Sequence, residues 1–371
     1  MVSLKNCSLE EFEAISNGRR IIPFGAGGWL ESLDIELLDF LKQQCPYVID
    51  NGFEKSSVQF RGSEFPVYKP EKLLEERDCI VLFTSPVYMY DMYKQIMRIN
   101  LEGNIDCYGF PYMTITGDPT INQDVLSKVI DNSVTGRSNT RIPKVIHSFW
   151  FSGEAKPENY QKCIDSWHKV CPDYQIIEWN LNNYDSGISP FMQRALDLKA
   201  WAFATDYARL ATVYRYGGIY LDMDVELLRC PDNLLNNTAF FNFSNNACVD
   251  TAVFAAERDS KAVKKILDSY NDVELPTTKD GYRRFFASSF QRKAIQSLGV
   301  IYDGSLQIIN GIAFLPRTFF MPMDFVLFEM SAKSEYTYGI HYDNFGWSID
   351  GIDVRAKKIN DNRRLYSMIM K

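Results

Sequence analysis

The segment from residue 194 to residue 224 constrains the fold more than any other part of the chain. Apolar residues recur at steps of three and four over residues 194–216, which predicts a long amphipathic helix. Gly217 and Gly218 follow, and glycine supplies the left-handed backbone conformation that ends a helix. A short apolar run then predicts a strand that ends at Asp222 and Asp224. This order of elements favours an α/β fold with two acids at the end of a strand.

The spacing of the two acids suits a metal ion. Side chains two residues apart on an extended backbone share one face. Hard divalent cations such as Mg²⁺ and Mn²⁺ prefer carboxylate oxygens, and a bound cation can neutralise a diphosphate leaving group. An isolated Asp-x-Asp is a weak signal, because most such pairs are solvated turn residues. The surrounding residues therefore decide whether Asp222 and Asp224 form a site.

The preceding helix adds an acid and a base. Asp206 and Arg209 lie three residues apart, so they share one face of the helix. Asp206 can accept hydrogen bonds from sugar hydroxyls, and Arg209 can pair with a phosphate or with Asp222. The alternative interpretation is a structural salt bridge between Asp206 and Arg209.

Composition narrows the class of protein. A chain of 371 residues should form about two domains. The net charge is −7 and no block of lysine and arginine occurs, which argues against a nucleic-acid partner. Residues 1–20 carry charges throughout, unlike a signal peptide, and no apolar run approaches the roughly 20 residues of a membrane span. The eight cysteines form no Cys-x-x-Cys pair and only three histidines occur, so we expect free thiols in a cytoplasmic protein and no multi-histidine zinc site.

A polar segment without periodicity, residues 131–141, is the predicted linker between a domain at 1–130 and a domain at 142–371. In the first domain, residues 20–24 predict a strand that runs into a glycine-rich turn. A helix over 31–41 and a strand over 47–49 follow. This order is typical of a small Rossmann-like domain.

The glycine pattern of that domain is incomplete. Leu30 stands where the dinucleotide-binding fingerprint needs its third glycine, although Asp50 lies at a suitable distance to hold a ribose. A Rossmann-like accessory domain without a cofactor is therefore favoured over a nucleotide-binding domain, and an oxidoreductase is a weak alternative. The segment resembles the small Rossmann-like modules attached to bacterial sugar-modifying enzymes.

Four blocks of the second domain carry a family resemblance. Residues 142–153, 163–167, 199–209 and 216–224 resemble family 32 of the glycosyltransferases, in family order. That family contains enzymes with a DXD sugar-binding region, akin to yeast initiation mannosyltransferases, bacterial capsular polysaccharide enzymes and, distantly, clostridial glucosylating toxins. The likeness covers about residues 142–350.

The resemblance implies a GT-A fold, the fold of nucleotide-diphospho-sugar transferases. It also implies a UDP- or GDP-linked sugar donor, a Mn²⁺ or Mg²⁺ ion and, usually, retention of anomeric configuration. The residues that it places around the donor are Trp150 on the base, Thr205, Asp206 and Arg209 on the ribose and sugar, Tyr220 beside the donor, Asp222 on the ribose and a metal-bound water, and Asp224 on the metal. Thr205 stands where the family usually has serine and keeps the hydroxyl.

Residues 337–348 resemble the closing block of the family. His341 is then a candidate metal or phosphate ligand, with a structural histidine as the alternative, and Trp347 is a candidate indole donor to the leaving phosphate. Gly346 replaces the usual serine, which puts a hydroxyl contribution at that step in doubt. Asp250 either reaches the hydroxyls of the donor sugar or caps a helix.

The expected function is a metal-dependent glycosyltransferase, a hexosyltransferase that transfers a sugar to a glycan, a lipid-linked glycan or another hydroxyl acceptor. Surface polysaccharide biosynthesis is the expected setting, in the cytoplasm or at the periphery of the inner membrane. The catalytic set is Asp222, Asp224, Arg209 and Trp347. If configuration is retained, the leaving phosphate oxygen can take the acceptor proton and no protein base is required.

The alternatives are a nucleotide-sugar hydrolase and a regulatory or binding protein with a vestigial site. The aromatic residues at 319–328 either line an acceptor groove, touch a membrane surface or belong to the core, which we favour.

Overall fold

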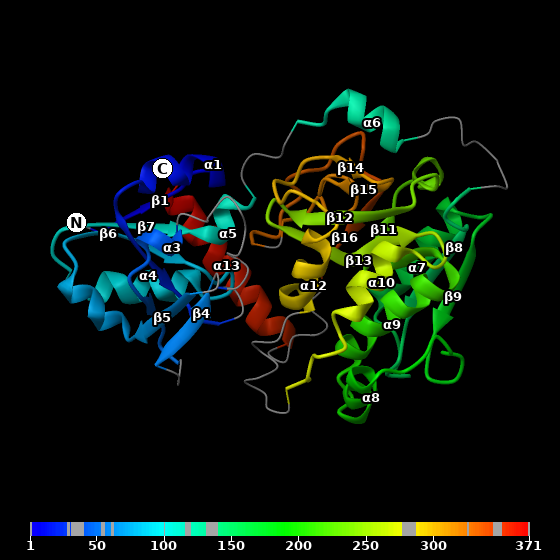
Figure 1. Ribbon diagram of the computed structural model, residues 1–371, viewed down its shortest axis with the longest axis horizontal. Helices are drawn as coiled ribbons and strands as arrows, with labels where there is room; N and C mark the ends of the chain where they lie inside the picture. Colours follow the sequence, from blue (N-terminus) through cyan, green and yellow to red (C-terminus); the bar gives the residue numbers. More distant parts are fainter. Residues whose placement is uncertain are drawn as a thin grey trace. The chain divides into compact units, whose positions relative to one another are not determined.

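The computed structural model describes residues 2–27, 30, 41–52, 56–60, 63–99, 101–115, 120–130, 140–276, 287–324, 326–343 and 351–369. The chain folds into two compact units (Figure 1). Unit 1 contains Met1–Gly117, Phe325–Phe328 and Asp350–Lys371, and unit 2 contains Asp118–Asp324 and Glu329–Ile349. We describe each unit by itself.

Unit 1 is built on a seven-stranded sheet with the strand order β1-β7-β6-β2-β3-β5-β4. Every neighbouring pair is parallel except β4 and β5. The strands are β1 (Val2–Lys5), β2 (Arg20–Phe24), β3 (Val48–Ile49), β4 (Ser57–Phe60), β5 (Ser63–Tyr68), β6 (Asp78–Phe83) and β7 (Asn104–Gly109). Its helices are α1 (Leu9–Ser16), α3 (Leu41–Gln44), the 3₁₀ helix η2 (Pro70–Glu75), α4 (Met89–Arg98), α5 (Phe110–Met113) and α13 (Gly351–Ile369).

The strands predicted at 20–24 and 47–49 are confirmed by β2 and β3, which pair in parallel. The helix predicted over 31–41 lies outside the described residues except for its last position. Asp50 accepts hydrogen bonds from the backbone N–H groups of Ala26 and Gly52, both at 2.8 Å. Its carboxylate therefore closes the glycine-rich loop onto the end of β3. The mostly parallel sheet agrees with the expected α/β class, and a Rossmann-like assignment stays a prediction.

The division into units differs from the domains expected at 1–130 and 142–371. Helix α13 belongs to unit 1, where the Tyr112 hydroxyl donates to Asn362 O at 2.9 Å and Asn362 Nδ2 donates to Pro86 O at 2.7 Å. Helix α6 (Gln123–Val129) belongs to unit 2, where Asn237 Nδ2 donates to Val129 O at 2.9 Å. In both cases hydrogen bonds join the helix to residues of the same unit that are far away in the sequence. Most of the predicted linker lies outside the described residues.

Unit 2 contains a mixed seven-stranded sheet with the order β14-β15-β12-β13-β10-β8-β9. Strands β10, β8 and β9 are parallel, whereas β13 runs antiparallel to both β10 and β12. The strands are β8 (Val145–Phe149), β9 (Gln175–Trp179), β10 (Gly218–Leu221), β12 (Ala239–Asn245), β13 (Cys248–Ala256), β14 (Gln307–Ile309) and β15 (Ile312–Leu315). A second sheet pairs β11 (Val225–Leu227) with β16 (Gly339–His341) in antiparallel orientation. Unit 2 is therefore of the expected mixed α/β class.

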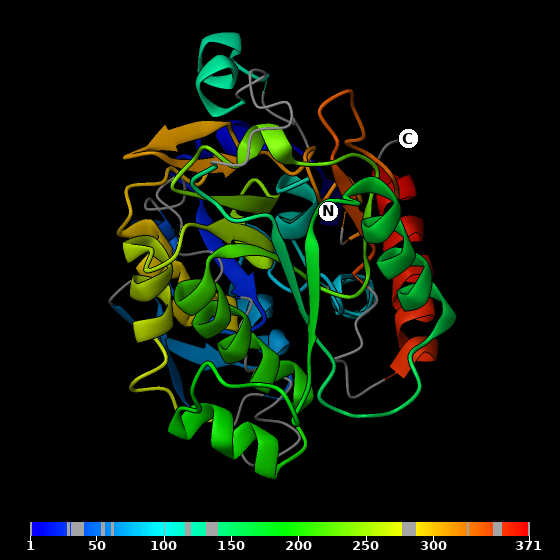
Figure 2. The same ribbon diagram turned by 90° about the vertical axis from the view of Figure 1, so that its right-hand side faces the viewer.

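Helices cover this sheet, and α9 packs against β8, β10 and β13 and beside α8 and α10 (Figure 2). The helical elements of unit 2, in addition to α6, are α7 (Glu158–Val170), α8 (Pro190–Asp197), α9 (Trp201–Tyr216), the 3₁₀ helix η3 (Asp232–Leu234), α10 (Lys261–Asp268) and α12 (Ala287–Gln296). The prediction of a single helix over 194–216 is wrong, because the helix is interrupted between α8 and α9. Lys199 adopts a left-handed conformation there with a φ of 54°, which an α-helix cannot contain.

Phe319 and Phe320 are fully buried and pack within the core of unit 2, so the core interpretation of that aromatic cluster holds for these two residues. All eight cysteines are free thiols, as expected. Within the described ranges, no helix combines the length and apolar character that a membrane crossing requires.

Candidate functional site

The turn between α9 and β10 requires its two glycines. Gly217 and Gly218 have φ angles of 67° and 107°. A Cβ atom on Gly218 would lie 2.7 Å from Val145 O, and one on Gly217 would lie 2.8 Å from Arg258 N. Both the backbone conformation and the close packing therefore exclude side chains at this turn.

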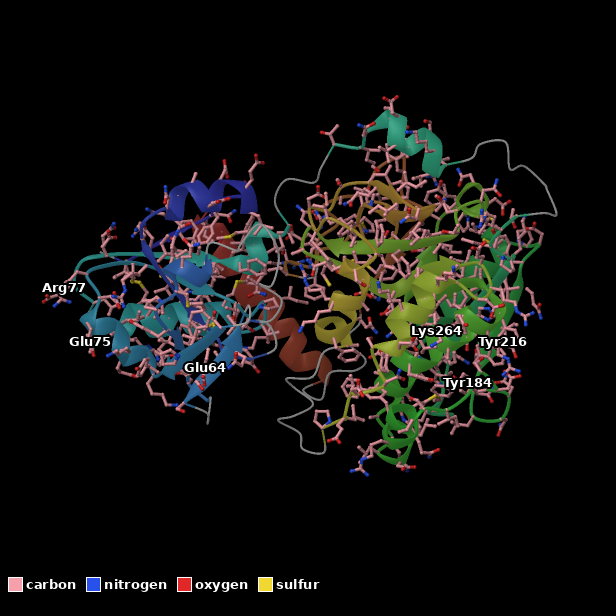
Figure 3. All side chains as sticks on the ribbon, viewed as in Figure 1. Glu64, Glu75, Arg77, Tyr184, Tyr216 and Lys264 are labelled. Atoms are coloured by element: carbon pink, nitrogen blue, oxygen red, sulfur yellow. The ribbon has the colours of Figure 1, made fainter. Side chains whose placement is uncertain are left out.

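His147 holds the same turn from the neighbouring strand β8. Its Nε2 atom lies 2.9 Å from Gly217 O, and Trp179 Nε1 donates to its Nδ1 atom at 3.1 Å. Because Nδ1 accepts, Nε2 carries the proton and donates to the carbonyl. Burial lowers the pKa of His147 to about 4, so the imidazole is neutral at pH 7. Trp179 stacks on Tyr216 with 5.7 Å between the ring centroids, and Tyr184 contacts Trp179 edge-on. Figure 3 labels Tyr184 and Tyr216, which lie in the same part of unit 2.

The two acids lie in a turn that follows β10. The strand ends at Leu221, whose carbonyl accepts from Ser148 Oγ at 2.8 Å, and Asp222 N donates to Ala252 O at 2.9 Å. Val225 N donates to Asp222 O at 3.1 Å, which closes the turn before β11. The expectation that both acids share one face of an extended strand is therefore corrected, and turn geometry brings them together.

The small sheet places His341 beside the acids. Val225 pairs with His341 in the register of β11 and β16, and Tyr342 N donates to Asp224 O at 3.1 Å. One potential ligand atom each of Asp222, Asp224 and His341 lies within 4.8 Å of the other two. His341 Nε2 is 3.2 Å from Asp224 Oδ1. Burial opposes the charged imidazole, but the Asp224 carboxylate outweighs this effect and raises the pKa of His341 to about 10.

These three side chains fit a divalent cation. Two carboxylates supply the oxygen ligands that Mg²⁺ and Mn²⁺ prefer, and an imidazole is an acceptable further ligand for a first-row transition metal. The expectation that His341 is a candidate metal ligand is therefore supported by geometry, although a role in metal binding stays a prediction.

Arg209 links the helix to the acids. The guanidinium pairs with the Asp206 carboxylate, lies 3.5 Å from Asp222 Oδ1 through Nη1, and donates to Thr251 O at 3.1 Å. It also lies 5.2 Å from the centre of the Tyr220 ring. Among the described residues, its buried Nε atom has no hydrogen-bond partner. The salt bridge to Asp206 and the contact with Asp222 therefore occur together.

Asp222 is surrounded by charged and hydrogen-bonding side chains. The Tyr220 hydroxyl donates to its Oδ1 atom. Burial raises the pKa of Asp222 and the neighbouring Asp224 carboxylate adds to this effect, whereas Arg209 opposes it. The local charge therefore favours a positively charged ligand beside Asp222 and Asp224.

The remaining predicted residues are placed as follows. Trp150 is partly buried after β8, and its indole donates to Glu154 O at 2.7 Å. Thr205 is partly buried on α9. Asp250 lies within β13, where it accepts from Ala252 N at 2.6 Å, so the helix-cap alternative is wrong. Trp347 lies outside the described residues.

Sequence reasoning missed the groups that orient the site without providing a ligand. The Ser148 hydroxyl, Thr251 O and Tyr342 N contact Leu221, Arg209 and Asp224 respectively. Two of these three groups, Thr251 O and Tyr342 N, are backbone atoms, which leave no signal in the sequence. The serine follows His147 in β8, and only the parallel pairing of β8 with β10 would have pointed to it.

A family model matches part of unit 2. Residues 157–241 match the family model for a glycosyltransferase sugar-binding region containing a DXD motif. Inositol phosphoceramide mannosyltransferase 3 of Schizosaccharomyces pombe is 27% identical over 148 residues, which are 38% of this chain and 40% of that protein. Mannosyl phosphorylinositol ceramide synthase CSH1 of Saccharomyces cerevisiae is 30% identical over 176 residues, which are 43% of this chain and 45% of that protein.

A solved structure, the PaToxG glycosyltransferase, aligns with a TM-score of 0.36 at 18% identity, over 48% of this chain and 75% of that chain. The chain spans less than half the length of the two yeast relatives. The matched family region contains Asp206, Arg209, Tyr220, Asp222 and Asp224. His341 lies outside that region.

Proposed function

We propose that this chain is a metal-dependent glycosyltransferase of the GT-A fold that transfers a hexose from a nucleotide sugar to a hydroxyl acceptor. The observation that carries the proposal is the convergence of Asp222, Asp224 and His341 within 4.8 Å, beside the buried Arg209. Asp222, Asp224 and Arg209 come from the segment that matches a sugar-binding DXD region, and His341 comes from outside it.

In the proposed reaction, Asp222, Asp224 and His341 would hold Mn²⁺ or Mg²⁺, and the ion would supply positive charge beside the departing diphosphate. Arg209 is a second positive group at the same place, since its guanidinium lies 3.5 Å from Asp222. Positive groups that are already positioned stabilise the leaving charge without reorganisation. The chain therefore contributes mainly electrostatic stabilisation and positioning.

Asp206 accepts from sugar or ribose hydroxyls in this proposal, with Thr205 and Asp250 as further donor contacts. Trp150 stacks on the base, and Trp347 donates to the leaving phosphate, as the resemblance implies. Retention of configuration belongs to the same proposal, because the leaving phosphate oxygen then accepts the acceptor proton. A protein base is not required for that course.

The relatives suggest a class of sugar and acceptor. One yeast protein is named an inositol phosphoceramide mannosyltransferase and the other a mannosyl phosphorylinositol ceramide synthase. We therefore propose a mannosyl or related hexosyl donor and an acceptor hydroxyl on a glycan or a polar lipid head group. Surface polysaccharide biosynthesis and a cytoplasmic or membrane-peripheral location are parts of this proposal.

The decisive experiment is calorimetric titration of UDP and GDP into the metal-free chain, with and without Mn²⁺. We expect Mn²⁺-dependent binding of one nucleotide that Asp224→Asn abolishes. The matched control is Glu158→Gln, which changes a largely exposed carboxylate paired with Lys162 on α7 and should leave binding intact. The absence of binding for both nucleotides would contradict the proposal and favour a vestigial site.

Turnover separates the transferase from a hydrolase that uses the same donor site. The nucleotide that binds identifies which labelled nucleotide sugars to test, with and without candidate hydroxyl acceptors. A product that contains the acceptor supports the transferase. Release of free sugar at the same rate with every acceptor would contradict it and support the hydrolase.

A further inference from the structure

Two cysteines of unit 2 meet where α7 ends. Cys171 caps the C-terminus of α7, and its backbone N–H donates to Trp167 O at 2.8 Å. Cys230 follows β11 after two intervening residues. The two thiols are neighbours, because Cys230 packs against the buried core cluster of unit 2 that contains Cys171, although 58 residues lie between them in the sequence. The side chain of Cys171 is buried, with 1% of the residue exposed, whereas Cys230 is partly exposed.

The groups around the pair distinguish the two thiols. Cys230 Sγ donates to Asp232 Oδ1 at 3.2 Å, and the Tyr174 hydroxyl donates to the same oxygen at 2.6 Å. Lys144 Nζ lies 3.1 Å from that carboxylate oxygen. Tyr174 also binds the backbone of Cys171, because its N–H donates to Cys171 O at 3.1 Å. Tyr174 and Asp232 thus hold both cysteines in one cluster.

Contact with the Cys171 thiol lowers the pKa of the Cys230 thiol, although burial and the Asp232 carboxylate oppose this shift. The same contact, together with burial, raises the pKa of Cys171. The thiolate is the reactive form of cysteine. Cys230 is therefore both the more accessible and the more readily ionised member of the pair, and Cys171 is placed to react second.

We propose that Cys171 and Cys230 are an oxidation site, at which a small disulfide such as oxidised glutathione produces a reversible intrachain disulfide bond. The Cys230 thiolate attacks one sulfur of the oxidant, breaks its S–S bond and releases the first glutathione. The Cys171 thiol then loses its proton and attacks Cys230 Sγ in the mixed disulfide, which releases the second glutathione. The two cysteines lose two electrons and two protons, and the oxidant gains them as two glutathione thiols.

The disulfide bond would link the end of α7 to the segment that follows β11, the strand next to Asp224. Trp167 Nε1 donates to Val225 O at 2.7 Å, and Leu227 N donates to Ser166 Oγ at 2.9 Å, so α7 already holds β11. Val225 directly follows Asp224. The loop closed by the disulfide contains α9, β10 and both acids of the site. A cross-link that closes such a long loop restricts the unfolded chain, and we expect it to raise the melting temperature of unit 2.

The test uses the full chain treated with oxidised glutathione, alkylated and mapped by peptide mass spectrometry. We expect linked Cys171 and Cys230 peptides, which disappear on treatment with dithiothreitol. In Cys171→Ser the glutathione adduct should persist on Cys230, and in Cys230→Ser residue 171 should remain unmodified. The matched control Cys248→Ser removes the other partly exposed cysteine and should leave the link intact.

Thermal unfolding of the same samples tests the consequence. The linked protein should melt at least about 3 °C above the reduced protein, and Cys230→Ser should show no such difference. A stable glutathione adduct on Cys230 in the unsubstituted chain would overturn the proposal. So would an unreacted Cys230 or a link to a different cysteine. If Cys171→Ser does not fold, mapping of the unsubstituted chain and Cys230→Ser still decides.

Discussion

Replacing the charge of Arg209 should destabilise unit 2 strongly. The Arg209 side chain is 10% exposed, and it contacts the carboxylates of Asp206 and Asp222, which are 14% and 28% exposed. In Arg209→Met a flexible apolar side chain fills most of the space, and the two carboxylates lose their nearest cation. Removal of one partner from a buried ion pair typically costs about 3–5 kcal/mol, because the remaining charge is left uncompensated.

This cost should appear as a large fall in melting temperature. For a domain of this size, 1 kcal/mol corresponds to about 2–4 °C, so the expected fall is about 6–20 °C. The assay is thermal unfolding in metal-free buffer, followed by circular dichroism. Arg215→Met is the matched control, because Arg215 lies on the same helix in an exposed pair with Asp185. Such surface pairs contribute at most about 1 kcal/mol.

A second substitution tests the cause. Asp206→Asn removes one of the two carboxylates that Arg209 leaves behind, so the double variant should be more stable than Arg209→Met alone. The coupling between the two substitutions should reach about 1 kcal/mol or more, as is common for residues in contact. The melting temperature can be measured with an error of about 1 °C. A value for Arg209→Met that lies within about 2 °C of the Arg215→Met value would refute the argument. A double variant no more stable than the single one would refute it as well.

Three further predictions concern stability. His147 has a pKa lowered to about 4 by burial, below its usual value of about 6.5, so its stabilising effect is complete above pH 6.5 and falls as the pH approaches 4. Unit 2 should lose about 2 kcal/mol from this residue by pH 5, and the pH dependence of melting should be flatter in His147→Gln. Burial opposes the charge on Asp106, but the Lys5 and Arg19 side chains with the Ser3 hydroxyl lower its pKa to about 2. Asp106 therefore contributes about 2 kcal/mol to the free energy of unfolding above pH 4, and this contribution is lost as the pH falls through 2. Urea unfolding of unit 1 at pH 7 should show that loss in Asp106→Asn, and a change below 0.5 kcal/mol would contradict the assignment. Gly218→Ala should lower the yield of folded chain or destabilise it by at least about 1–3 kcal/mol. The reason is that φ is 107° and the new Cβ would lie 2.7 Å from Val145 O. A variant as stable as the original chain would be inconsistent with this backbone.

The parts of the site that could be predicted from sequence are local. Gly217 and Gly218, the apolar strand and the two acids are consecutive, so their order alone indicates where the acids lie. The break at Lys199 could not be predicted, because a left-handed lysine leaves the apolar periodicity on both sides intact. His341 follows Asp224 by more than a hundred residues, and only the family resemblance pointed to it.

The two compact units differ from the expected domains for a related reason. Composition marks residues 131–141 as polar, but the extent of a unit depends on which surfaces become buried. Asn362 lies far from β6 in sequence, yet its side chain donates to Pro86 O and Val326 O within unit 1. Such long-range hydrogen bonds have no local pattern, so helix α13 could not be assigned to the first unit from sequence.

The geometry of the metal cluster depends on the register of a very small sheet. Strands β11 and β16 have three residues each, and their pairing sets Val225 opposite His341. A slip of one residue would turn the imidazole to the other face, because side chains alternate along a strand. Three contacts oppose such a slip, namely His341 N to Phe320 O at 2.9 Å, Tyr342 N to Asp224 O at 3.1 Å and Trp167 Nε1 to Val225 O at 2.7 Å. The position of His341 beside Asp224 is therefore a property of the packed core of unit 2, and residues that touch no ligand determine whether the three side chains can meet.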